Sequence, residues 1–425
     1  MPKVTVLLTS FNHEKFIKSA IDSVLNQTFS DYELLIVDDN SKDNSFKIIQ
    51  SYNDPRIIKI KNDRQMGPEH AFEIMLEKGT GEYVAIFHSD DVWDNTKLEK
   101  QVQYLDKNKD IGAVFTAVEV IGEDNKPRID VQDVYTNVFI TENKTRFEWL
   151  NRFFYLGNCL CHPSVMIRKQ LYFDCKMYTN TLAQVPDFYK WVQLLKKTDI
   201  HIMPERLTKY RVLNHEKNTS APTKERRIRA YTENYFLYNS YFELSDSDIL
   251  NVFPKLNSYV IDGQFVGKFA LAKLFLEEGY CNSQKLCAIE CLHSLLNGPE
   301  RHLIEKLYGY GFLQFIEDTK THDVFNVMQK NVQLATLFYD LGNGINENDC
   351  IKESFAFCTT EIEEINLTFN FKRPLNITRL RFDPLDGNKS IIDLISFKVN
   401  GVECKNKLKS NINDKIKELL NVTLN

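Results

Sequence analysis

Three acidic residues stand close together in the stretch AIFHSDDVWD, which runs from Ala85 to Asp94. The stretch begins as an apolar, strand-like run and ends in Asp90, Asp91 and Asp94. Adjacent carboxylates repel each other and raise each other's pKa unless a cation lies between them. A divalent metal ion is such a cation, because hard cations prefer carboxylate oxygens as ligands. The alternative is a solvated acidic turn, and the surrounding sequence decides between the two.

The composition is that of an ordinary globular protein. The 425 residues are enough for two or three domains, and 43% of them are hydrophobic and 26% charged. The formal net charge of −5 gives no electrostatic case for a nucleic-acid partner. No apolar run has the length of a membrane span, and the opening MPKVTVLLTSFNHE lacks the pattern of a signal peptide. We therefore expect a cytoplasmic protein without a transmembrane segment.

The nine cysteines are scattered, odd in number and irregular in spacing. This usage argues against a disulfide framework and favours a reducing compartment. Cys159 and Cys161 form a CxC pair, but no second pair follows at the spacing of a zinc site. We expect free, buried thiols instead.

Strand-like and helix-like segments alternate over the first hundred residues. Apolar runs predict strands at 3–11, 32–39, 56–62 and 82–91, and one-sided apolar patterns predict helices at 15–27, 44–52 and 68–79. The alternation indicates an α/β fold with a parallel sheet covered on both faces, which binds ligands at the carboxyl ends of its strands. Polar residues follow the first, second and fourth strands there: Thr9, Ser10, Asn12, Asp38, Asp39, Asp90 and Asp91. The acidic tip is therefore predicted to be a site.

The next hundred residues continue this unit. A helix from Lys97 leads to a strand predicted at 111–122, and a loop-rich region at 147–172 precedes a helix predicted at 185–197. Asp187 stands at the start of that last helix, where an Asp N-cap is a common structural feature. Its carboxylate is thus a candidate either for helix capping or for chemistry.

Three domains are predicted along the chain. Residues 1–222 form the α/β domain, residues 223–345 have a helical pattern rich in Tyr, Phe and Leu, and residues 346–425 alternate apolar and polar residues like antiparallel strands. The last part is predicted to be a small, sandwich-like β domain, cut short before a closing strand. An oligomer through the aromatic helices stays open, although their pattern contains no heptad seam.

Two segments together resemble a known family. VTVLLTSFNHEKFIKSAIDSVLNQTFSDYELLIVDDNSKDNS is similar to the opening of family 2 glycosyltransferases, and GEYVAIFHSDDVWDNTKLEKQV is similar to their metal-binding D-x-D-D segment. The resemblance covers about the first half of the chain and implies a GT-A (nucleotide-diphospho-sugar transferase), Rossmann-like fold. It further implies that a sugar moves from a nucleotide diphosphate donor to a hydroxyl group, with inversion at the anomeric carbon.

The resemblance assigns roles by position. Asp187, in VPDFYKW, matches the catalytic base. Asp90 and Asp91 match the metal segment, with His215 in YRVLNHEKNTS as a further metal or diphosphate contact, so the implied cofactor is Mn²⁺ or Mg²⁺. The donor nucleotide would be bound by Thr9, Phe11, Asn12, Asp39 and Asp90.

Weaker candidates surround this set. Arg211 matches a loop that meets the diphosphate, whereas His162 either touches the acceptor or closes a turn. Trp191 and Tyr189 either stack on an acceptor sugar or belong to the core. Lys61 and Arg64 either contact the donor or lie in a solvated loop.

The sequence departs from the family pattern at two positions. His88 stands where the first acid of D-x-D-D is expected, and Pro186 replaces the Glu that usually precedes the base. His88 favours an alternative, a catalytically inactive protein that binds a glycan or a partner. A nucleotidyltransferase would need a glycine-rich, basic loop after the first strand, and LTSFNHEKF is not one.

These residues predict a metal-dependent inverting glycosyltransferase. It would move a sugar from a UDP- or dTDP-sugar to a glycan or lipid-linked glycan in bacterial surface polysaccharide biosynthesis. A metal would neutralise the charge that grows on the leaving diphosphate, and a carboxylate would take the proton of the acceptor hydroxyl. Acceptors linked to lipid would be met by peripheral contact with the inner face of the cell membrane.

Overall fold

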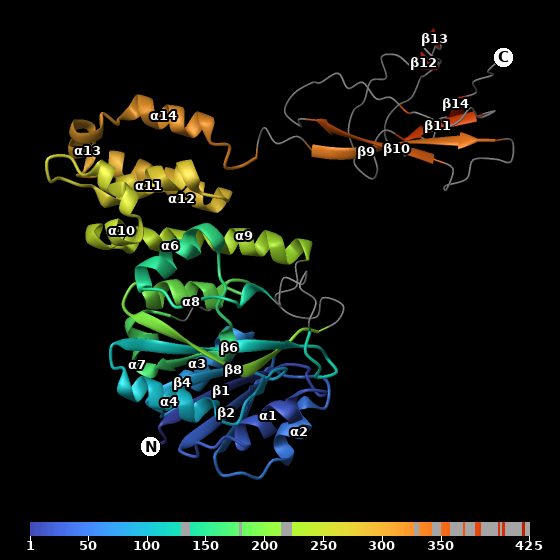
Figure 1. Ribbon diagram of the computed structural model, residues 1–425. Helices are drawn as coiled ribbons and strands as arrows, with labels where there is room; N and C mark the ends of the chain where they lie inside the picture. The colour runs from blue at the N-terminus through green and yellow to red at the C-terminus, as the bar shows by residue number, and fades with distance from the viewer. Residues whose placement is uncertain are drawn as a thin grey trace. The chain divides into compact units, whose positions relative to one another are not determined.

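The computed structural model describes residues 1–128, 137–177, 181–213, 223–326, 331–341, 350–357, 369, 379–383, 398–399, 402–403 and 419–420 (Figure 1). The chain divides into two compact units, Met1–His322 and Asp323–Asn425. The first contains an α/β sheet domain followed by helices, and the second contains a small antiparallel sheet. The predicted fold class is therefore confirmed. Within the described part of the chain, no helix has the length and apolar character needed to cross a bilayer.

An eight-stranded sheet forms the base of the first unit, in the order β3-β2-β1-β4-β7-β6-β8-β5. Strands β3, β2, β1 and β4 are parallel, as predicted, but β7 runs antiparallel to both β4 and β6. The parallel arrangement predicted for these four strands is thus confirmed, while the complete sheet is mixed. The bounds are β1 Val4–Ser10, β2 Tyr32–Asp38, β3 Ile57–Lys61, β4 Tyr83–His88, β5 Val92–Trp93, β6 Ile111–Ile121, β7 Met166–Arg168 and β8 Asp199–Arg211.

The register brings the polar strand ends together. Thr9 on β1 lies opposite Val37 on β2 and His88 on β4, and Ser10 lies opposite Asp38. The prediction that the first, second and fourth strands deliver polar residues to one edge is confirmed. Close packing at the other end of β4 requires a glycine, because a Cβ on Gly81 would lie 2.5 Å from the backbone nitrogen of Thr5.

Helices cover both faces of the sheet. One face packs against α1 (Ile17–Leu25), α2 (Ser45–Ser51) and α4 (Lys97–Lys107), whose apolar residues share a core with alternate residues of β1, β2 and β4. The opposite face packs against α3 (Pro68–Lys78), α6 (Arg146–Leu156), α7 (Lys169–Asp174) and α8 (Pro186–Leu195). Both faces of the central strands are therefore dry, which explains their continuous apolar runs.

Helix α6 lies in the region that the sequence predicted to be loop-rich. Thr145 caps it, accepting a hydrogen bond from the Glu148 amide, while the Glu148 carboxylate accepts one from the Thr145 amide. This capping box satisfies two amides at the start of the helix. Its aromatic residues Trp149, Phe153 and Phe154 are fully buried, so the prediction is corrected to a core helix.

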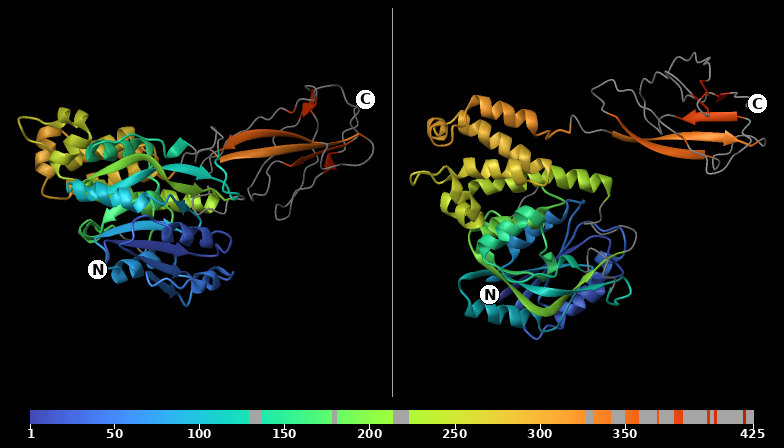
Figure 2. Two further views of the ribbon diagram at one scale, coloured as in Figure 1. Left: turned by 60° about the horizontal axis from the view of Figure 1, so that its bottom comes forward. Right: turned by 45° about the horizontal axis from the view of Figure 1, so that its top comes forward.

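The helical region is continuous with the sheet domain. From the sheet outward, α8 is followed by α6, α9 and α10, then by α11 and α12, then by α13 and α14 (Figure 2). One core spans these layers, so the predicted division at residue 222 does not separate compact units. The bounds are α9 Lys224–Asn239, α10 Asp246–Val252, α11 Gly267–Glu278, α12 Asn282–Leu296, α13 Arg301–Tyr308 and α14 Phe312–Thr321.

The second unit begins earlier than the sequence predicted. Strand β9 (Asn331–Asp340) lies within the range expected to be helical, and it pairs antiparallel with β10 (Cys350–Phe357) and β11 (Arg379–Asp383). The helical prediction for these residues is wrong, because pairing with distant strands decides their conformation. Short strands follow at β12 Lys398–Val399, β13 Val402–Glu403 and β14 Leu419–Leu420. Most of the predicted β domain at 346–425 lies outside the described residues.

We expect the sheet domain and the helical region to unfold together, because they share one core. Phe154 is fully buried against Tyr238, Phe253 and Phe275. Phe154→Ala is expected to lower the free energy of unfolding by about 3–5 kcal/mol, as large-to-small changes of buried aromatic residues do. Tryptophan fluorescence during urea unfolding measures it.

The matched control is Phe312→Ala, since that side chain is 69% exposed. Its effect is expected to stay within about 0.5 kcal/mol. Two separate fluorescence transitions in the unmodified chain would contradict the shared core.

Candidate functional site

The tip of β4 carries a buried carboxylate with one oxygen unused. Asp91 is 1% exposed, and its Oδ1 accepts a hydrogen bond of 2.8 Å from the Arg211 amide. Its Oδ2 is buried and has no hydrogen-bond partner in the described part of the chain. Burial raises the pKa of Asp91 well above its ordinary value, and the neighbouring Asp90 carboxylate adds to the rise. A cation at Oδ2 would offset both the burial of the Asp91 charge and its repulsion by Asp90.

A metal ion fits this position. His88, Asp90 and Asp91 each offer one ligand atom, and the three atoms lie within 4.8 Å of one another. The His88 Nδ1 is 3.9 Å from the unpaired Asp91 Oδ2, and burial lowers the pKa of His88, which favours the neutral imidazole that binds metals. The residue that departs from the family pattern thus stands among the possible ligands. Asp94 does not, because its exposed carboxylate caps the Thr96 amide at 2.9 Å.

Arg211 holds the tip in place. Its Nε donates to the Asp90 carbonyl at 2.6 Å, and its two terminal nitrogens donate to the Gly122 carbonyl and to Asn125 Oδ1. The guanidinium also lies over the Phe16 ring, 4.7 Å from the ring centre. The side chain is completely buried. All three guanidinium nitrogens thus donate to protein oxygens, and the contact of Arg211 with a diphosphate stays a prediction.

The predicted nucleotide residues lie around the ends of β1 and β2. Thr9 and Phe11 are half-buried, whereas Asn12 is exposed with a φ of 54°. The Asn12 side chain accepts a hydrogen bond of 2.7 Å from the Lys42 amide, so it joins the loop after β1 to the loop after β2. Asp39 is buried and accepts hydrogen bonds from Asn62 Nδ2 and from the amides of Met66 and Gly67, each at 2.8 Å. Their contact with a nucleotide stays a prediction.

His13 is a member of the site that sequence reasoning missed. Its Nδ1 is 2.7 Å from the Ser89 hydroxyl, which places the loop after β1 against the tip of β4. Its amide donates to Ser45 at the start of α2. A polar residue in FNHE was the only sequence signal, and the contact with Ser89 spans 76 residues.

Asp187 enters the site from α8. The structure corrects the N-cap alternative, because Val185 is the N-cap and Asp187 lies in the first turn. Its Oδ2 accepts a hydrogen bond of 2.9 Å from Asn158 Nδ2, and its Oδ1 accepts one from the Phe188 amide. Burial raises the pKa of Asp187, while the Phe188 amide and the Lys190 charge oppose the rise. A helix N-terminus favours an anion, but desolvation outweighs that effect here.

A buried ion pair lies beside Asp187. Lys190 Nζ is 2.7 Å from both carboxylate oxygens of Glu69, and the two side chains are 0% and 7% exposed. This pair fastens α8 to α3 one turn beyond Asp187. Burial lowers the pKa of His162 well below its ordinary value, and His88 and then the Lys190 charge lower it further.

His162 connects the tip of β4 to α8 through ring contacts. Its ring centre lies 5.1 Å from that of His88 and 5.6 Å from that of Trp191. Its Nε2 is buried and has no hydrogen-bond partner among the described residues. Trp191 is fully buried against Phe115, which favours the core alternative for this residue over contact with an acceptor.

Cys161 marks the place where the two acidic elements meet. Burial raises the pKa of its thiol well above the usual value, and the carboxylates of Asp91 and Asp187 both add to the rise. Both carboxylates therefore act on the same thiol. Seven described cysteines, this one included, are free, in agreement with the expected thiols.

Helix α9 supplies a support that the sequence did not indicate. Glu233, buried on α9, accepts hydrogen bonds from the amides of Ala183, Gln184 and Val185 at 2.7–3.0 Å. These are the three residues before α8. The carboxylate thus fixes the entry to the helix that carries Asp187, although 46 positions separate the two residues in the sequence.

The remaining candidates are distributed around the site. His215 lies outside the described residues. Lys61 lies over the Phe46 ring, and Arg64 is exposed beside Met66. Tyr189 packs half-buried against the main core. The roles predicted for these residues are neither confirmed nor contradicted by their positions.

Comparison with known proteins identifies similar sequences. The family model described as Glycosyl transferase family 2 matches residues 5–172. The UDP-Glc:alpha-D-GlcNAc-diphosphoundecaprenol beta-1,3-glucosyltransferase WfgD of Escherichia coli is 30% identical over 200 residues, which cover 46% of this chain and 71% of that protein. An uncharacterized glycosyltransferase of Methanocaldococcus jannaschii is 29% identical over 253 residues, 57% of this chain and 84% of that protein.

A solved structure is also similar. TarS residues 1–349 of S. aureus, in complex with UDP-GlcNAc, has 17% sequence identity and a TM-score of 0.48. The superposition covers 84% of this chain and 99% of that one.

Metal binding is expected to depend on Asp91. Mn²⁺ should raise the melting temperature of the unmodified protein, because a ligand that binds only the native state stabilises it by mass action. Asp91→Asn should lose this rise. Without metal, the variant should be at least as stable as the parent at neutral pH. Burial raises the pKa of Asp91 in the folded state above its value in the unfolded state. The parent therefore loses stability as pH increases from the unfolded-state pKa to the folded-state pKa.

Differential scanning fluorimetry with and without Mn²⁺ measures both effects. Asp31→Asn is the control, since that side chain is exposed. An undiminished Mn²⁺ effect in Asp91→Asn would exclude this carboxylate as a ligand.

Removing one member of the buried ion pair is expected to be costly. Lys190→Met should lower the free energy of unfolding by about 3–5 kcal/mol, because it leaves the Glu69 charge buried and unpaired. Lys190→Met combined with Glu69→Met should recover most of the loss. Urea unfolding followed by fluorescence measures the stability of the single and the double variant. The control is Lys18→Met, which breaks an exposed ion pair and should change the free energy of unfolding by less than about 1 kcal/mol. A double variant as unstable as the single one would contradict this account.

Proposed function

The chain belongs to glycosyl transferase family 2, and from that premise we propose that it is a metal-dependent, inverting enzyme that extends a bacterial surface glycan. The observation that carries the proposal is the unpaired, buried Oδ2 of Asp91 within the His88–Asp90–Asp91 group. Asp91 as a metal ligand and Asp187 as a base, both close enough to affect the Cys161 thiol, would supply the two groups that inverting sugar transfer needs.

The metal would be Mn²⁺ or Mg²⁺. Both are hard cations that use one or two protein carboxylates and complete their shell with phosphate and water oxygens. Bound at this group, the ion would neutralise the charge on the departing nucleoside diphosphate. His88, Asp90 and Asp91 are the residues that would hold it.

Asp187 would act as the general base. The acceptor oxygen attacks the anomeric carbon from the face opposite the diphosphate, and its proton passes to the Asp187 carboxylate. The bond between the anomeric carbon and the phosphate oxygen breaks, and its electrons leave with the diphosphate. Asn158 and the Phe188 amide hold the two carboxylate oxygens, which fixes the direction of the base. The raised pKa of Asp187 also brings it nearer to the operating pH, which suits proton transfer.

The donor is proposed to be a UDP-sugar, with a dTDP-sugar as the second possibility. WfgD, the relative at 30% identity, is named for transfer of glucose from UDP-glucose to a diphosphoundecaprenol-linked GlcNAc. The acceptor is accordingly proposed to be a glycan linked to lipid by a diphosphate. The donor residues would be Thr9, Phe11, Asn12, Asp39 and Asp90.

The alternative function is binding without catalysis. Its sequence support was His88 in place of an acid. His88 offers a potential ligand atom within 4.8 Å of those of Asp90 and Asp91. His88 therefore no longer favours the alternative over the enzyme. It predicts nucleotide or glycan binding without nucleotide release.

Nucleotide release tests the proposal. The unmodified protein with Mn²⁺ should release UDP from UDP-glucose or UDP-GlcNAc, or dTDP from dTDP-glucose, when given a synthetic α-GlcNAc diphospholipid. Asp187→Asn should lower kcat by about 10²–10⁴-fold and leave nucleotide binding unchanged. The parent rate should fall as pH decreases through the raised pKa of Asp187, because only the ionised carboxylate takes the proton.

Asp174→Asn is the control, since Asp174 is exposed on α7. Nucleotide binding without release from any donor would support the non-catalytic alternative. Full activity in Asp187→Asn would refute the base assignment alone.

A further inference from the structure

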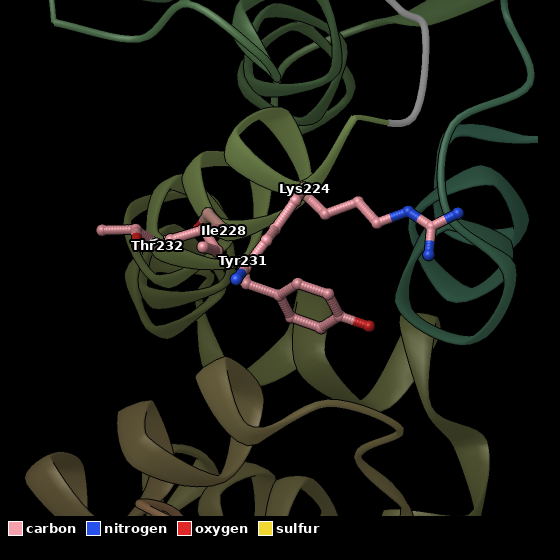
Figure 3. A pocket seen from close by; sticks show the side chains of 5 residues that line it. Lys224, Ile228, Tyr231 and Thr232 are labelled. Atoms are coloured by element: carbon pink, nitrogen blue, oxygen red, sulfur yellow. Dashed lines mark hydrogen bonds between the residues drawn. The ribbon is translucent and has the colours of Figure 1, made fainter. Parts of the chain in front are cut away.

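A hollow open to solvent lies along one face of the first half of α9. It has a volume of about 640 Å³ and is lined by Lys224, Arg227, Ile228, Tyr231 and Thr232 (Figure 3). These positions belong to one helical face, since they fall within an arc of about 140° at 3.6 residues per turn. Arg226 and Arg229 fall outside this arc and take no part. We call this feature the α9 hollow.

Lys224 and Arg227 give the α9 hollow two positive charges. Both side chains are exposed, and neither forms a side-chain hydrogen bond or an ion pair in the part of the chain that the structure describes. The acid of this turn, Glu225, folds back to the start of the helix, where its carboxylate binds Thr223. The two cations are therefore available to an oxyanion, which ammonium and guanidinium groups bind through charge-assisted hydrogen bonds.

Two apolar side chains complete the wall of the hollow. Ile228 and Tyr231 are 59% and 58% exposed, although the same helix is anchored in the main core through Leu237 and Tyr238. Ligand pockets typically combine accessible aliphatic and aromatic side chains with a few charged groups. The α9 hollow therefore fits a ligand that carries an oxyanion beside a less polar part.

The hollow is next to the start of α12. The Tyr231 carbonyl accepts a hydrogen bond of 2.5 Å from Ser283 Oγ, in the first turn of that helix. Tyr280 lies just before the helix, and its hydroxyl is hydrogen-bonded to that of Tyr238 on α9. Tyr280 is therefore held against the same side of α9 as Tyr231.

Tyr280 connects this region to the base. A Cβ added to Gly157 would lie 4.0 Å from the Tyr280 hydroxyl, and the next residue, Asn158, binds the Asp187 carboxylate. Glu233 on α9 also binds the three amides directly before α8. The helix that carries the α9 hollow is thus fixed to the helix that carries Asp187 by two separate sets of contacts.

We propose that the α9 hollow binds a phosphate group of the glycan acceptor. The inference rests on the proposed function and deepens it, because it assigns a separate site to the charged part of the acceptor. The diphosphate of the donor belongs with the metal group at the tip of β4, whereas the α9 hollow is connected to the base that the acceptor meets. Lys224 and Arg227 would bind the phosphate oxygens, and Ile228 and Tyr231 would pack against the adjoining, less polar part of the acceptor.

Pyrophosphate binding without metal or donor is the first test. In EDTA, isothermal titration calorimetry of the full chain should detect binding of inorganic pyrophosphate. Lys224→Gln combined with Arg227→Gln should weaken it about 25-fold, since each exposed ion pair contributes up to about fivefold. The control, Lys78→Gln combined with Lys107→Gln, removes the same charge from exposed positions on α3 and α4 and should bind like the parent.

This measurement needs no turnover, so its result does not depend on the proposed function. Absence of binding by the parent, or equal binding by the two double variants, would overturn the inference. Unchanged melting temperatures show that both variants are folded.

Acceptor kinetics are the second test. With Mn²⁺ and UDP-glucose, UDP-GlcNAc or dTDP-glucose, Lys224→Gln combined with Arg227→Gln should raise the KM for the synthetic α-GlcNAc diphospholipid about 25-fold. It should leave kcat, the KM for the donor and the KM for octyl α-GlcNAc, which has no phosphate, at the parent's values. A structural defect near Asp187 would lower kcat with both acceptors instead.

The outcomes separate the two proposals. Weakened pyrophosphate binding with an unchanged KM for the diphospholipid would overturn the acceptor in favour of a free anion, and it would leave the proposed function intact. Absence of transfer by the parent from every donor would refute the proposed function and, with it, the acceptor as the occupant of the hollow.

Discussion

The buried carboxylate of Asp91 is the constraint on which the rest of the site depends. A charge at this depth is costly unless it is paired, and the Arg211 amide satisfies only one of its two oxygens. The tip is nonetheless rigid, because the Arg211 side chain binds the Asp90 carbonyl, the turn after β6 and the Phe16 ring together. The fold thereby keeps an unfavourable carboxylate in place, and a divalent cation is the partner that would relieve it.

The second part of the site is built on α8, and it too contains a desolvated carboxylate held by hydrogen bonds. Asp187 is desolvated, and its carboxylate is oriented by Asn158 and by a backbone amide. The Lys190–Glu69 pair fixes the helix below it and brings a positive charge nearby. The two acids thus come from separate elements, a strand tip and a helix start, and each has its own support.

Local sequence patterns were enough to predict the first four strands and the edge at which their polar residues gather, but not β5, β7 or β8. The side-chain period and the rule for carboxyl ends of parallel strands placed Asp39, Asp90 and Asp91 correctly. Contacts between distant segments were not predictable in this way, and they include His13 with Ser89 and Asn158 with Asp187. Strand β9 was taken for helix because NVQLATLFYD contains apolar residues at both spacings, and its pairing with β10 settles the conformation. Nor does a sequence reveal that the guanidinium of Arg211 is already occupied.

The hydrogen bonds of Glu233 bear on how such chains diversify. One simple expectation is that a helix following the sheet can be exchanged between relatives that use different acceptors. Here such an exchange would remove the carboxylate that accepts hydrogen bonds from the three amides before α8. The two halves of the first unit are therefore expected to be inherited together, and recombination is expected to succeed at the junction near residue 322 sooner than at the one near 222.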